Sequence, residues 1–401
     1  MISVEEASAR ILATFTPVGA ETVALAEAAG RISAAPVIAR TTQPPADVSA
    51  MDGFAVRAEE ARGGAALRLI GSAPAGHPFA GSVGAGETVR IFTGSFIPAG
   101  ADAVLLQEDA DAEEGGVRVR ETVRPGQHIR RMGQDFAHGD VVIAAGRRLS
   151  SRDIGLAAAA DHPWLLVHRR PRVAVLATGD EIALPGEPIP PGGIVSSNAH
   201  ALAAMVAALG GAPSVLPIAA DDTEAIGRAA DAARGFDLLL TTGGISVGAH
   251  DLVQEGLARR GLAVDFWKIA MRPGKPLMFG RLGEMPVLGL PGNPVAAFVC
   301  ALLFARPALL RLAGLAAAPL PTTTAETATA LGANDRRFDF LRARLEEDAA
   351  GRLVATAFAV QDSAMQAVLA RADALILRPP HAPAVAAGAA VEIVRFDRLG
   401  L

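Results

Sequence analysis

Short apolar runs alternate with longer helix-like stretches over residues 172–312, and this alternation constrains the fold more than any other feature of the chain. The predicted strands are Arg172–Ala177, Pro213–Ile218, Phe236–Leu240 and Pro286–Leu290. The predicted helices are Asn198–Leu209, Thr223–Arg234, Asp251–Arg260 and a long helix after Pro294. Strands that are apolar on both faces, each followed by a helix, form a parallel, doubly wound sheet. Since the loops after such strands converge on a ligand crevice, we expect functional residues there.

The regions on either side of this segment have a different pattern. We predict helices at Val4–Ala13 and Glu21–Ala29, and a capped helix at Ser150–Asp161. From about residue 49 to 140, short β-like runs separated by Gly, Pro and Asp turns predict a compact β-rich domain. Similar runs after Pro319 fit a small barrel or sandwich of ~80 residues.

The composition permits several domains and disfavours some classes of partner. The chain has 401 residues, 51% of them hydrophobic, which is enough for about two to four domains. Its net charge is −5 and no basic patch is interleaved with aromatic residues, which argues against nucleic acid. The N-terminus lacks the features of a signal peptide. The longest apolar stretch, Val295–Leu312, is interrupted by Arg306, Pro307 and Arg311, so we expect a soluble, cytoplasmic protein.

Only two of the 37 basic residues are lysine, and both lie in the short segment Asp265–Pro276. An ammonium group is a compact cation that can follow an oxyanion into a tight site, whereas a guanidinium prefers a flat partner with two oxygens. The loop around Lys275, Arg272-Pro-Gly-Lys-Pro276, is rich in turn-forming residues. We predict that Lys268 and Lys275 converge on one anionic ligand. The alternative is a codon bias that left two lysines close together by chance.

A glycine-rich segment, residues 241–251, follows the third predicted strand. Gly243 and Gly244 allow the backbone to approach a ligand closely, and the next helix begins with partial positive charge. Together these features suit a phosphate. The alternative is an ordinary strand–helix turn in which Asp251 is the helix N-cap. The chain contains neither a Walker A sequence nor a G-x-G-x-x-G fingerprint.

Polar residues also follow the other predicted strands. Asp180 and Glu181 come after the first strand, Asp221 and Asp222 after the second, and Pro291-Gly-Asn-Pro294 after the last. Carboxylates beside a phosphate site commonly hold Mg²⁺, which prefers oxygen ligands. The alternative is that some of these acidic residues are helix N-caps.

The first half of the chain carries its own polar residues. Asp52 lies beside a glycine, Thr93 ends a predicted strand, and Arg130, Arg131 and Asp135 are close in sequence. Arginines near glycines suit oxyanions, although exposed arginines are more often solvated surface. The single cysteine and the eight scattered histidines have neither the pairing of a disulfide nor the spacing of a metal site.

In combination these segments resemble the molybdopterin molybdenumtransferases, the family of MoeA and of the C-terminal domain of gephyrin. The resemblance covers essentially the whole chain, and the segments occur in the family's order. They include Ser49-Ala-Met-Asp-Gly-Phe54, Phe92-Thr-Gly94 with Pro98-Ala-Gly-Ala-Asp-Ala-Val104, Pro125-Gly-Gln127 through Gly133-Gln-Asp135, Thr178-Gly-Asp-Glu181, Thr242-Gly-Gly-Ile-Ser-Val-Gly248, Trp267-Lys-Ile-Ala-Met-Arg-Pro-Gly-Lys-Pro276, Gly289-Leu-Pro-Gly-Asn-Pro294 and Gln361-Asp-Ser-Ala-Met365.

The resemblance implies four domains in an elongated homodimer. Their expected boundaries are 1–45 with 141–170 (dimerisation), 46–140 (β-rich), 171–318 (doubly wound, molybdopterin-binding) and 319–401 (C-terminal β-barrel). It implies that molybdate is inserted into adenylylated molybdopterin with Mg²⁺ or a similar ion, releasing AMP and molybdenum cofactor. The active site would lie between the doubly wound domain of one subunit and the front domains of its partner. The product would pass to molybdoenzymes or their chaperones.

The resemblance also assigns residues by segment match. The expected catalytic residues are Asp52, Asp135, Glu181, Asp221, Asp251, Lys268 and Lys275. The expected cofactor-binding residues are Thr93, Gly243, Gly244, Ser246, Gly248, Arg272, Pro291, Asn293, Arg342 and Ser363. The expected metal ligands are Glu181, Asp221 and Asp251. Arg272 stands where many members have lysine and Phe54 where tyrosine is common, and neither difference removes a charge.

Two other functions stay open. The first is a molybdopterin adenylyltransferase or related nucleotide-cleaving enzyme that uses the same doubly wound domain. The second is a non-catalytic scaffold, since gephyrin also anchors receptors. The front ~150 residues, a domain-sized segment, and Arg342 with Ser363 at the rear favour metal insertion. The retained charged positions argue against a pure scaffold. Molybdate and tungstate are similar tetrahedral dianions, so both fit the sequence.

Overall fold

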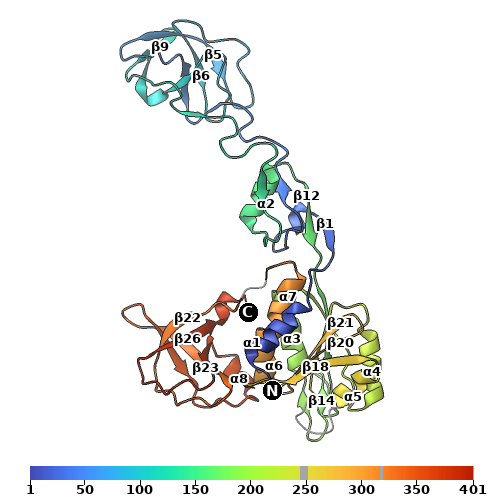
Figure 1. Cartoon of the computed structure of the whole chain (residues 1–401). Coiled ribbons are helices and arrows are strands. Elements are labelled where there is room, and N and C mark those ends of the chain that lie inside the picture. Colours follow the sequence, from blue (N-terminus) through green and yellow to red (C-terminus); the bar gives the residue numbers. More distant parts are fainter. Residues whose placement is uncertain (244–251, 317–318, 401) are drawn as a thin grey trace. The chain divides into compact units, whose positions relative to one another are not determined.

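The computed structural model describes residues 1–243, 252–316 and 319–400, and the chain divides into two compact units (Figure 1). Unit 1 consists of Met1–Glu21, Gly30–Ala34 and Leu166–Leu401. Unit 2 consists of Thr22–Ala29 and Ala35–Leu165.

Unit 1 is built around a six-stranded sheet with the strand order β16-β13-β17-β21-β20-β18. The strands, in that order, are Ala212–Val215, Arg172–Ala177, Leu238–Thr242, Met285–Leu290, Pro276–Leu282 and Leu262–Lys268. The first four are parallel, whereas β20 is antiparallel to β21 and β18 is antiparallel to β20. The predicted doubly wound sheet is confirmed, but it is mixed rather than wholly parallel. The short connection between β18 and β20 can join antiparallel strands but is too short for a parallel crossover.

Helices cover both faces of this sheet, and a separate apolar core lies between the sheet and the helices on each face. They are α3 (Asn198–Ala208), α4 (Thr223–Ala232), α5 (Leu252–Ala258) and α6 (Pro294–Cys300). Successive side chains of β13 point to opposite faces. Val173 and Val175 pack in the core with α3 and α6, while Ala174 and Leu176 pack in the core with α4 and α5.

The long helix predicted after Pro294 is present, interrupted by a π-helical turn. Helix α6 continues through Ala301–Ala305 into α7 (Arg306–Leu312). The whole segment is long and apolar enough to cross a membrane, but 78% of its most apolar window is buried inside the protein. It packs with α1 (Val4–Ala13) in the main core of unit 1. It is therefore a core helix.

The C-terminal strands form a closed barrel, which decides between the two predicted alternatives. They are β22 (Thr323–Thr327), β23 (Phe338–Glu347), β24 (Leu353–Ala357), β25 (Ala374–Arg378) and β26 (Ala390–Arg395). Strand β23 pairs with both β24 and β25, so the ring of five strands closes. The short strand β19 (Met271–Arg272), from the hairpin between β18 and β20, pairs with β23. The hairpin thus contacts the barrel directly.

Unit 2 contains a six-stranded sheet, as its turn-rich pattern predicted. In the order of the sheet its strands are β7 (Ala103–Leu106), β4 (Gly53–Val56), β6 (Glu87–Ile91), β5 (Ala66–Ala73), β9 (Gly116–Val119) and β8 (Ala110–Glu113). Helix α2 (Ser151–Ala159) has the predicted cap: Ser150 and Asp153 form a reciprocal capping box. The helix predicted at Glu21–Ala29 is wrong. Its first part is strand β1 (Ala20–Ala24), where β-branched Thr22 and Val23 favour an extended backbone.

Candidate active site

The sheet topology brings most of the predicted loops of unit 1 to one edge. Strands β13, β17 and β21 are parallel and β18 runs in the same direction, so their carboxyl ends lie at the same edge. Lys268 ends β18 and Lys275 immediately precedes β20, which starts at that edge. Adjacent strands are ~4.8 Å apart, so the start of β20 lies ~10 Å from the end of β17. Lys275 therefore lies at the same edge of the sheet as the loop after β17, two strands away. The contact of either lysine with a ligand stays a prediction.

Part of the predicted glycine turn can be placed. Gly243 has a φ of +91°, and a Cβ atom there would lie 2.5 Å from the carbonyl oxygen of Thr178. Only glycine fits this approach of the loop to β13. A Cβ atom on Gly292 would lie 3.6 Å from the Cα of Gly243, so the loops after β17 and β21 are in contact. The other predicted residues of this segment, Gly244, Ser246, Gly248 and Asp251, lie outside the described residues.

Two of the three predicted metal ligands lie close together. The backbone N–H of Asp221 donates to Oδ1 of Asp180 (3.0 Å). Burial raises the pKa of Asp221, the backbone of Asp180 opposes this, and the negative charges of Asp180 and Glu181 raise it further. A bound cation would relieve this repulsion, and the oxygen donors suit a hard divalent ion. Within residues 1–243, 252–316 and 319–400, however, no group of three His, Cys, Asp or Glu side chains is arranged to hold a metal ion.

Asp222, next to this cluster, is a helix N-cap. Its Oδ1 accepts hydrogen bonds from the backbone N–H groups of Glu224 (2.8 Å) and Ala225 (3.0 Å) at the start of α4. These bonds lower the pKa of Asp222, whereas the pKa of Asp221 is raised. The structure therefore separates two adjacent carboxylates that the sequence could not distinguish.

The barrel contributes a buried cation. The side chain of Arg342 is 1% exposed, and its Nε donates to Oε1 of Gln361 (3.3 Å). Burial lowers the pKa of Arg342, and the charge of Asp362 acts in the opposite direction. In the part of the chain that the structure describes, Nη1 of Arg342 has no hydrogen-bond partner. Since buried charges are normally paired, a water molecule or a small anion is the kind of partner that this nitrogen lacks.

Ser363, two residues beyond Gln361, joins the barrel to the sheet edge. Its Oγ accepts a hydrogen bond from Nδ2 of Asn293 (2.8 Å), and its carbonyl oxygen accepts one from the backbone N–H of Val295 (3.0 Å) in the first turn of α6. The Ser363 hydroxyl can still donate its own proton to a ligand. The structure therefore brings together Asn293 and Ser363, which the sequence placed in separate domains.

Arg272 faces the barrel in this structure. Its Nε donates to both carboxylate oxygens of Asp339 (2.9 and 3.0 Å), and Nη2 also donates to Asp339. The hydrogen bonds to Asp339 raise the pKa of Arg272. This fork-like contact clamps the hairpin onto β23 and suits arginine better than lysine. A contact between Arg272 and the cofactor stays a prediction.

Replacing Arg272 by alanine should destabilise unit 1, because the Asp339 side chain is only 8% exposed and would lose its partner. We expect a loss of about 2 kcal/mol in the free energy of unfolding, which is less than for a fully buried pair because Arg272 is 48% exposed. Arg272→Lys should lose about half as much. Urea unfolding of the full chain measures both values. An unchanged unfolding midpoint for Arg272→Ala would show that the clamp is unimportant.

Unit 2 brings together two of the residues predicted there. Oδ1 of Asp52 accepts hydrogen bonds from the backbone N–H (2.7 Å) and the hydroxyl (2.8 Å) of Thr93. These bonds, with a smaller effect of Arg90, lower the pKa of Asp52. Arg131 pairs with Asp47. Asp135 is exposed, and its role stays a prediction.

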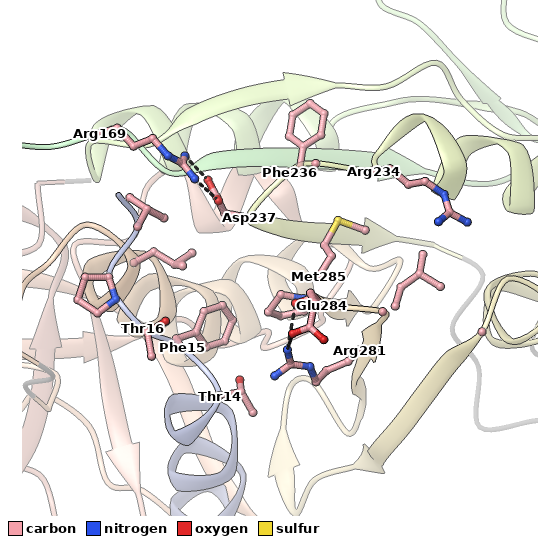
Figure 2. Close-up of a pocket in the computed structure, with 18 of the residues that line it drawn as sticks. Thr14, Phe15, Thr16, Arg169, Arg234, Phe236, Asp237, Arg281, Glu284 and Met285 are labelled. Atoms are coloured by element: carbon pink, nitrogen blue, oxygen red, sulfur yellow. Dashed lines mark hydrogen bonds and ion pairs between the residues drawn. The ribbon is translucent and has the colours of Figure 1, made fainter. Parts of the chain in front are cut away.

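A cavity of about 760 Å³ lies at the opposite, amino-terminal edge of the sheet (Figure 2). Four arginines line it, and all four are paired with carboxylates. The pairs are Arg169 with Asp237, Arg234 with Asp231, Arg260 with Asp231 and Glu224, and Arg281 with Glu284. These cations are already neutralised locally, so this cavity has less attraction for an anion than the edge that carries Lys268 and Lys275.

The fold and site define a multidomain protein with a doubly wound sheet domain, whose polar loops meet at one edge of the sheet, and a C-terminal barrel. Three family models cover most of the chain: MoeA N-terminal region (domain I and II) at residues 2–160, "Probable molybdopterin binding domain" at 174–311, and MoeA C-terminal region (domain IV) at 324–396. The chain belongs to the MoeA family.

Individual relatives agree with this assignment. The chain is 33% identical to the molybdopterin molybdenumtransferase of Haemophilus influenzae over the full length of both. It is 36% identical to molybdopterin molybdenumtransferase 2 of Mycobacterium tuberculosis, over 93% of this chain and 94% of the other. The crystal structure of the molybdopterin biosynthesis MoeA protein of Pyrococcus horikoshii superposes with a TM-score of 0.87 at 29% identity, covering 99% of each chain.

Proposed function

We propose that this chain is a molybdopterin molybdenumtransferase that inserts molybdenum from molybdate into adenylylated molybdopterin. The observation that carries the proposal is the buried guanidinium of Arg342, which is only partly paired among the described residues. Arg342 bonds to Gln361, and Ser363, two residues further along the chain, bonds to Asn293. This arrangement offers a site for a small oxyanion beside the loops that would hold the pterin phosphates. A nucleotide-cleaving enzyme built on the sheet domain alone has no need for such a site in the barrel.

In this proposal the residues have distinct roles. Arg342 and Ser363 hold the molybdate, while the glycine turn at Gly243 and the two lysines hold the pyrophosphate that joins pterin to adenosine. Lys268 and Lys275 stabilise charge that develops on the leaving phosphate. The two dithiolene sulfurs bond to molybdenum as molybdate oxygens take up protons and leave as water. A water molecule attacks the phosphoanhydride, so that one phosphate stays on the pterin and the other leaves as AMP.

The carboxylates Glu181 and Asp221, with Asp251, would hold Mg²⁺, which would supply Lewis-acid stabilisation of the phosphates. We extend the proposal to a cytoplasmic homodimer of four-domain subunits, with the domain boundaries given above. Asp52, Thr93 and Asp135 would then complete the site from the partner's front domains.

The direct test supplies the purified full chain with adenylylated molybdopterin and molybdate. We expect AMP and a molybdenum cofactor that reconstitutes an apo-molybdoenzyme, both dependent on molybdate. A parallel reaction with molybdopterin and ATP should give no adenylylated pterin. Activity in the second reaction alone would favour the adenylyltransferase, and activity in neither would favour the scaffold.

Magnesium binding should depend on pH through Asp221. Its raised pKa means that the folded state holds a proton more tightly than the unfolded state, for which the ordinary value is 3.8. Without metal, the stability from this proton is complete below pH ~4 and is lost as pH rises through the raised pKa. Mg²⁺ competes with that proton, so its affinity should rise over the same interval. Calorimetric titration of Mg²⁺ between pH 4 and 8 measures this.

Two variants sharpen the magnesium test. Asp221→Asn should weaken Mg²⁺ binding about tenfold or more and remove most of its pH dependence. The matched control is Asp222→Asn, since asparagine also caps helices well and this residue already has backbone partners. Equal effects of both substitutions would contradict the assignment of Asp221.

A further inference from the structure

A second cavity, of about 370 Å³, lies at one end of the C-terminal barrel. Its walls are the segment 329–334, the residues 357–359 at the end of β24, and the side chains of Asp339, Leu341, Gln361 and Arg378. Pockets that hold small organic molecules have volumes of roughly 300–1,000 Å³, so this cavity is large enough for a small ligand.

The side chain of Arg378 points into the barrel at this end. Successive side chains of a strand alternate between its two faces, and Ala374 and Ile376 of β25 lie in the barrel core. Arg378 is therefore on the inner face, and it is only 6% exposed. Asp339 is its direct partner across the pair of β23 and β25. A buried guanidinium thus forms part of the cavity wall.

The hydrogen bonding of this guanidinium is incomplete. Nη2 of Arg378 donates to the carbonyl oxygens of Gly332 (2.9 Å) and Pro383. In the part of the chain that the structure describes, its Nε and Nη1 have no hydrogen-bond partner, and no carboxylate forms an ion pair with it. The carboxylate of Asp339 is bonded to Arg272 instead. Two carbonyl oxygens offset a buried positive charge only in part.

The cavity is formed without a ligand. Leu331 and Val385 exchange two backbone hydrogen bonds (2.9 Å each). Nδ2 of Asn334 donates to the carbonyl oxygens of Arg378 (2.7 Å) and Pro379 (2.9 Å). These bonds tie the segment 329–334 to the loop after β25, so binding would require little further ordering of the chain.

The remaining walls favour an organic ligand over an inorganic ion. Leu331, Leu341 and Ala357 belong to the barrel core or pack against it, and each presents apolar surface to the cavity. An inorganic oxyanion could bind Arg378 but would leave these apolar walls uncovered. A neutral apolar molecule would leave the guanidinium without an anionic partner. A small anion with an apolar body matches both kinds of wall.

We propose that this cavity binds a small organic carboxylate. Its anionic group accepts hydrogen bonds from Arg378, and its apolar body contacts Leu341 and Ala357. The site is separate from Arg342, which lies on the opposite face of β23 from Leu341. Gln361 lies between the two sites, since it lines the cavity and accepts a hydrogen bond from Nε of Arg342 (3.3 Å). The inference goes beyond the proposed function and does not depend on it.

Benzoate is the probe, and its binding to the full chain, without pterin or molybdate, is measured by NMR detected on the ligand. We expect a dissociation constant of about 1 mM or lower for a ligand of this size. Benzamide has the same shape but no charge, and should bind at least about tenfold more weakly. Inorganic phosphate should also bind more weakly, because it buries no apolar surface. Molybdate should not displace benzoate.

Two variants test the residues. Arg378→Met should weaken benzoate binding at least about tenfold. Its matched control is Arg344→Met, because Arg344 is exposed on β23 and outside the cavity, and its loss should change the affinity less than about twofold. If Arg378→Met does not fold, Ala357→Leu decides. It fills part of the cavity, leaves Arg378 in place, and should also weaken binding at least about tenfold.

Several results would overturn the inference. Absence of benzoate binding, equal binding of benzoate and benzamide, or unchanged affinity in Arg378→Met or Ala357→Leu would remove the carboxylate site. Tighter binding of phosphate than of benzoate would show that the apolar walls are not used. Displacement of benzoate by molybdate would show that the cavity is not separate from the site at Arg342. None of these measurements involves AMP release or cofactor formation, so the proposed function stands or fails independently.

Discussion

Replacing Lys275 with alanine should reduce formation of the molybdenum cofactor about 100-fold or more while leaving the fold intact. An ammonium group ~4 Å from a phosphate charge contributes about 4 kcal/mol at an effective dielectric constant near 20. The side chain of Lys275 is exposed, and its backbone carbonyl oxygen keeps its hydrogen bond from the N–H of Ile269 (3.0 Å) in the variant. Release of AMP and cofactor formation measure the effect.

The hairpin that carries Lys275 packs closely against helix α6. Gly274 has a φ of +107°, and a Cβ atom there would lie 2.4 Å from Sγ of Cys300 in α6. Cys300 is fully buried, and burial raises the pKa of its thiol, so it stays neutral. The close packing of Gly274 against Cys300 therefore limits how far this loop can move toward α6.

Arg281→Ala is the control for the lysine, because Arg281 lies at the other end of the same strand and pairs with Glu284 (2.9 Å). It should keep nearly full activity, since it faces the opposite edge of the sheet. Full activity of Lys275→Ala would count strongly against convergence of the lysines on the substrate. Equal losses in the two variants would indicate a general effect on the sheet.

Replacing Arg342 with methionine should abolish at least 99% of molybdate insertion, yet leave the free energy of unfolding unchanged or about 1–2 kcal/mol higher. The guanidinium is 1% exposed and incompletely paired within the described residues, so its burial costs stability that an apolar side chain of similar volume would not cost. Such a conflict between stability and activity is typical of a binding site.

Urea unfolding and a molybdate titration of cofactor formation measure the two effects of Arg342→Met separately. Arg344→Met is the matched control, because Arg344 is exposed on the same strand, 6.0 Å from the ring of Phe358. It should alter neither quantity appreciably. A large loss of stability in Arg342→Met would show that the residue is structural, and retained activity would remove Arg342 from the molybdate site.

Much of the fold follows from local pattern. The strand predicted at Arg172–Ala177 and the helix predicted at Val4–Ala13 have the observed bounds. A continuous apolar run predicts the strand, and apolar residues at helical spacing predict the helix, and both patterns can be recognised within a few residues. The hairpin strands β18 and β20 were not predicted. Their apolar residues are interleaved with Asp265, Lys268 and Arg281, which obscures the pattern. The helix predicted at Glu21–Ala29 failed because β-branched residues favoured a strand.

The sequence by itself determined that several polar loops must meet at the carboxyl edge of one sheet, since parallel strands leave no other arrangement. Only the tertiary structure decided which side chain each loop residue meets. Arg272 contacts Asp339, which is 67 positions away in the sequence, and Asn198 contacts Gly292, which is 94 positions away. Hydrophobic periodicity predicts local helices and strands, but it does not predict contacts between residues so far apart in the sequence. Asp221 and Asp222 likewise look alike in sequence. One is a helix cap and the other a carboxylate with a raised pKa, because their surroundings are set by distant strands and not by their neighbours in the chain.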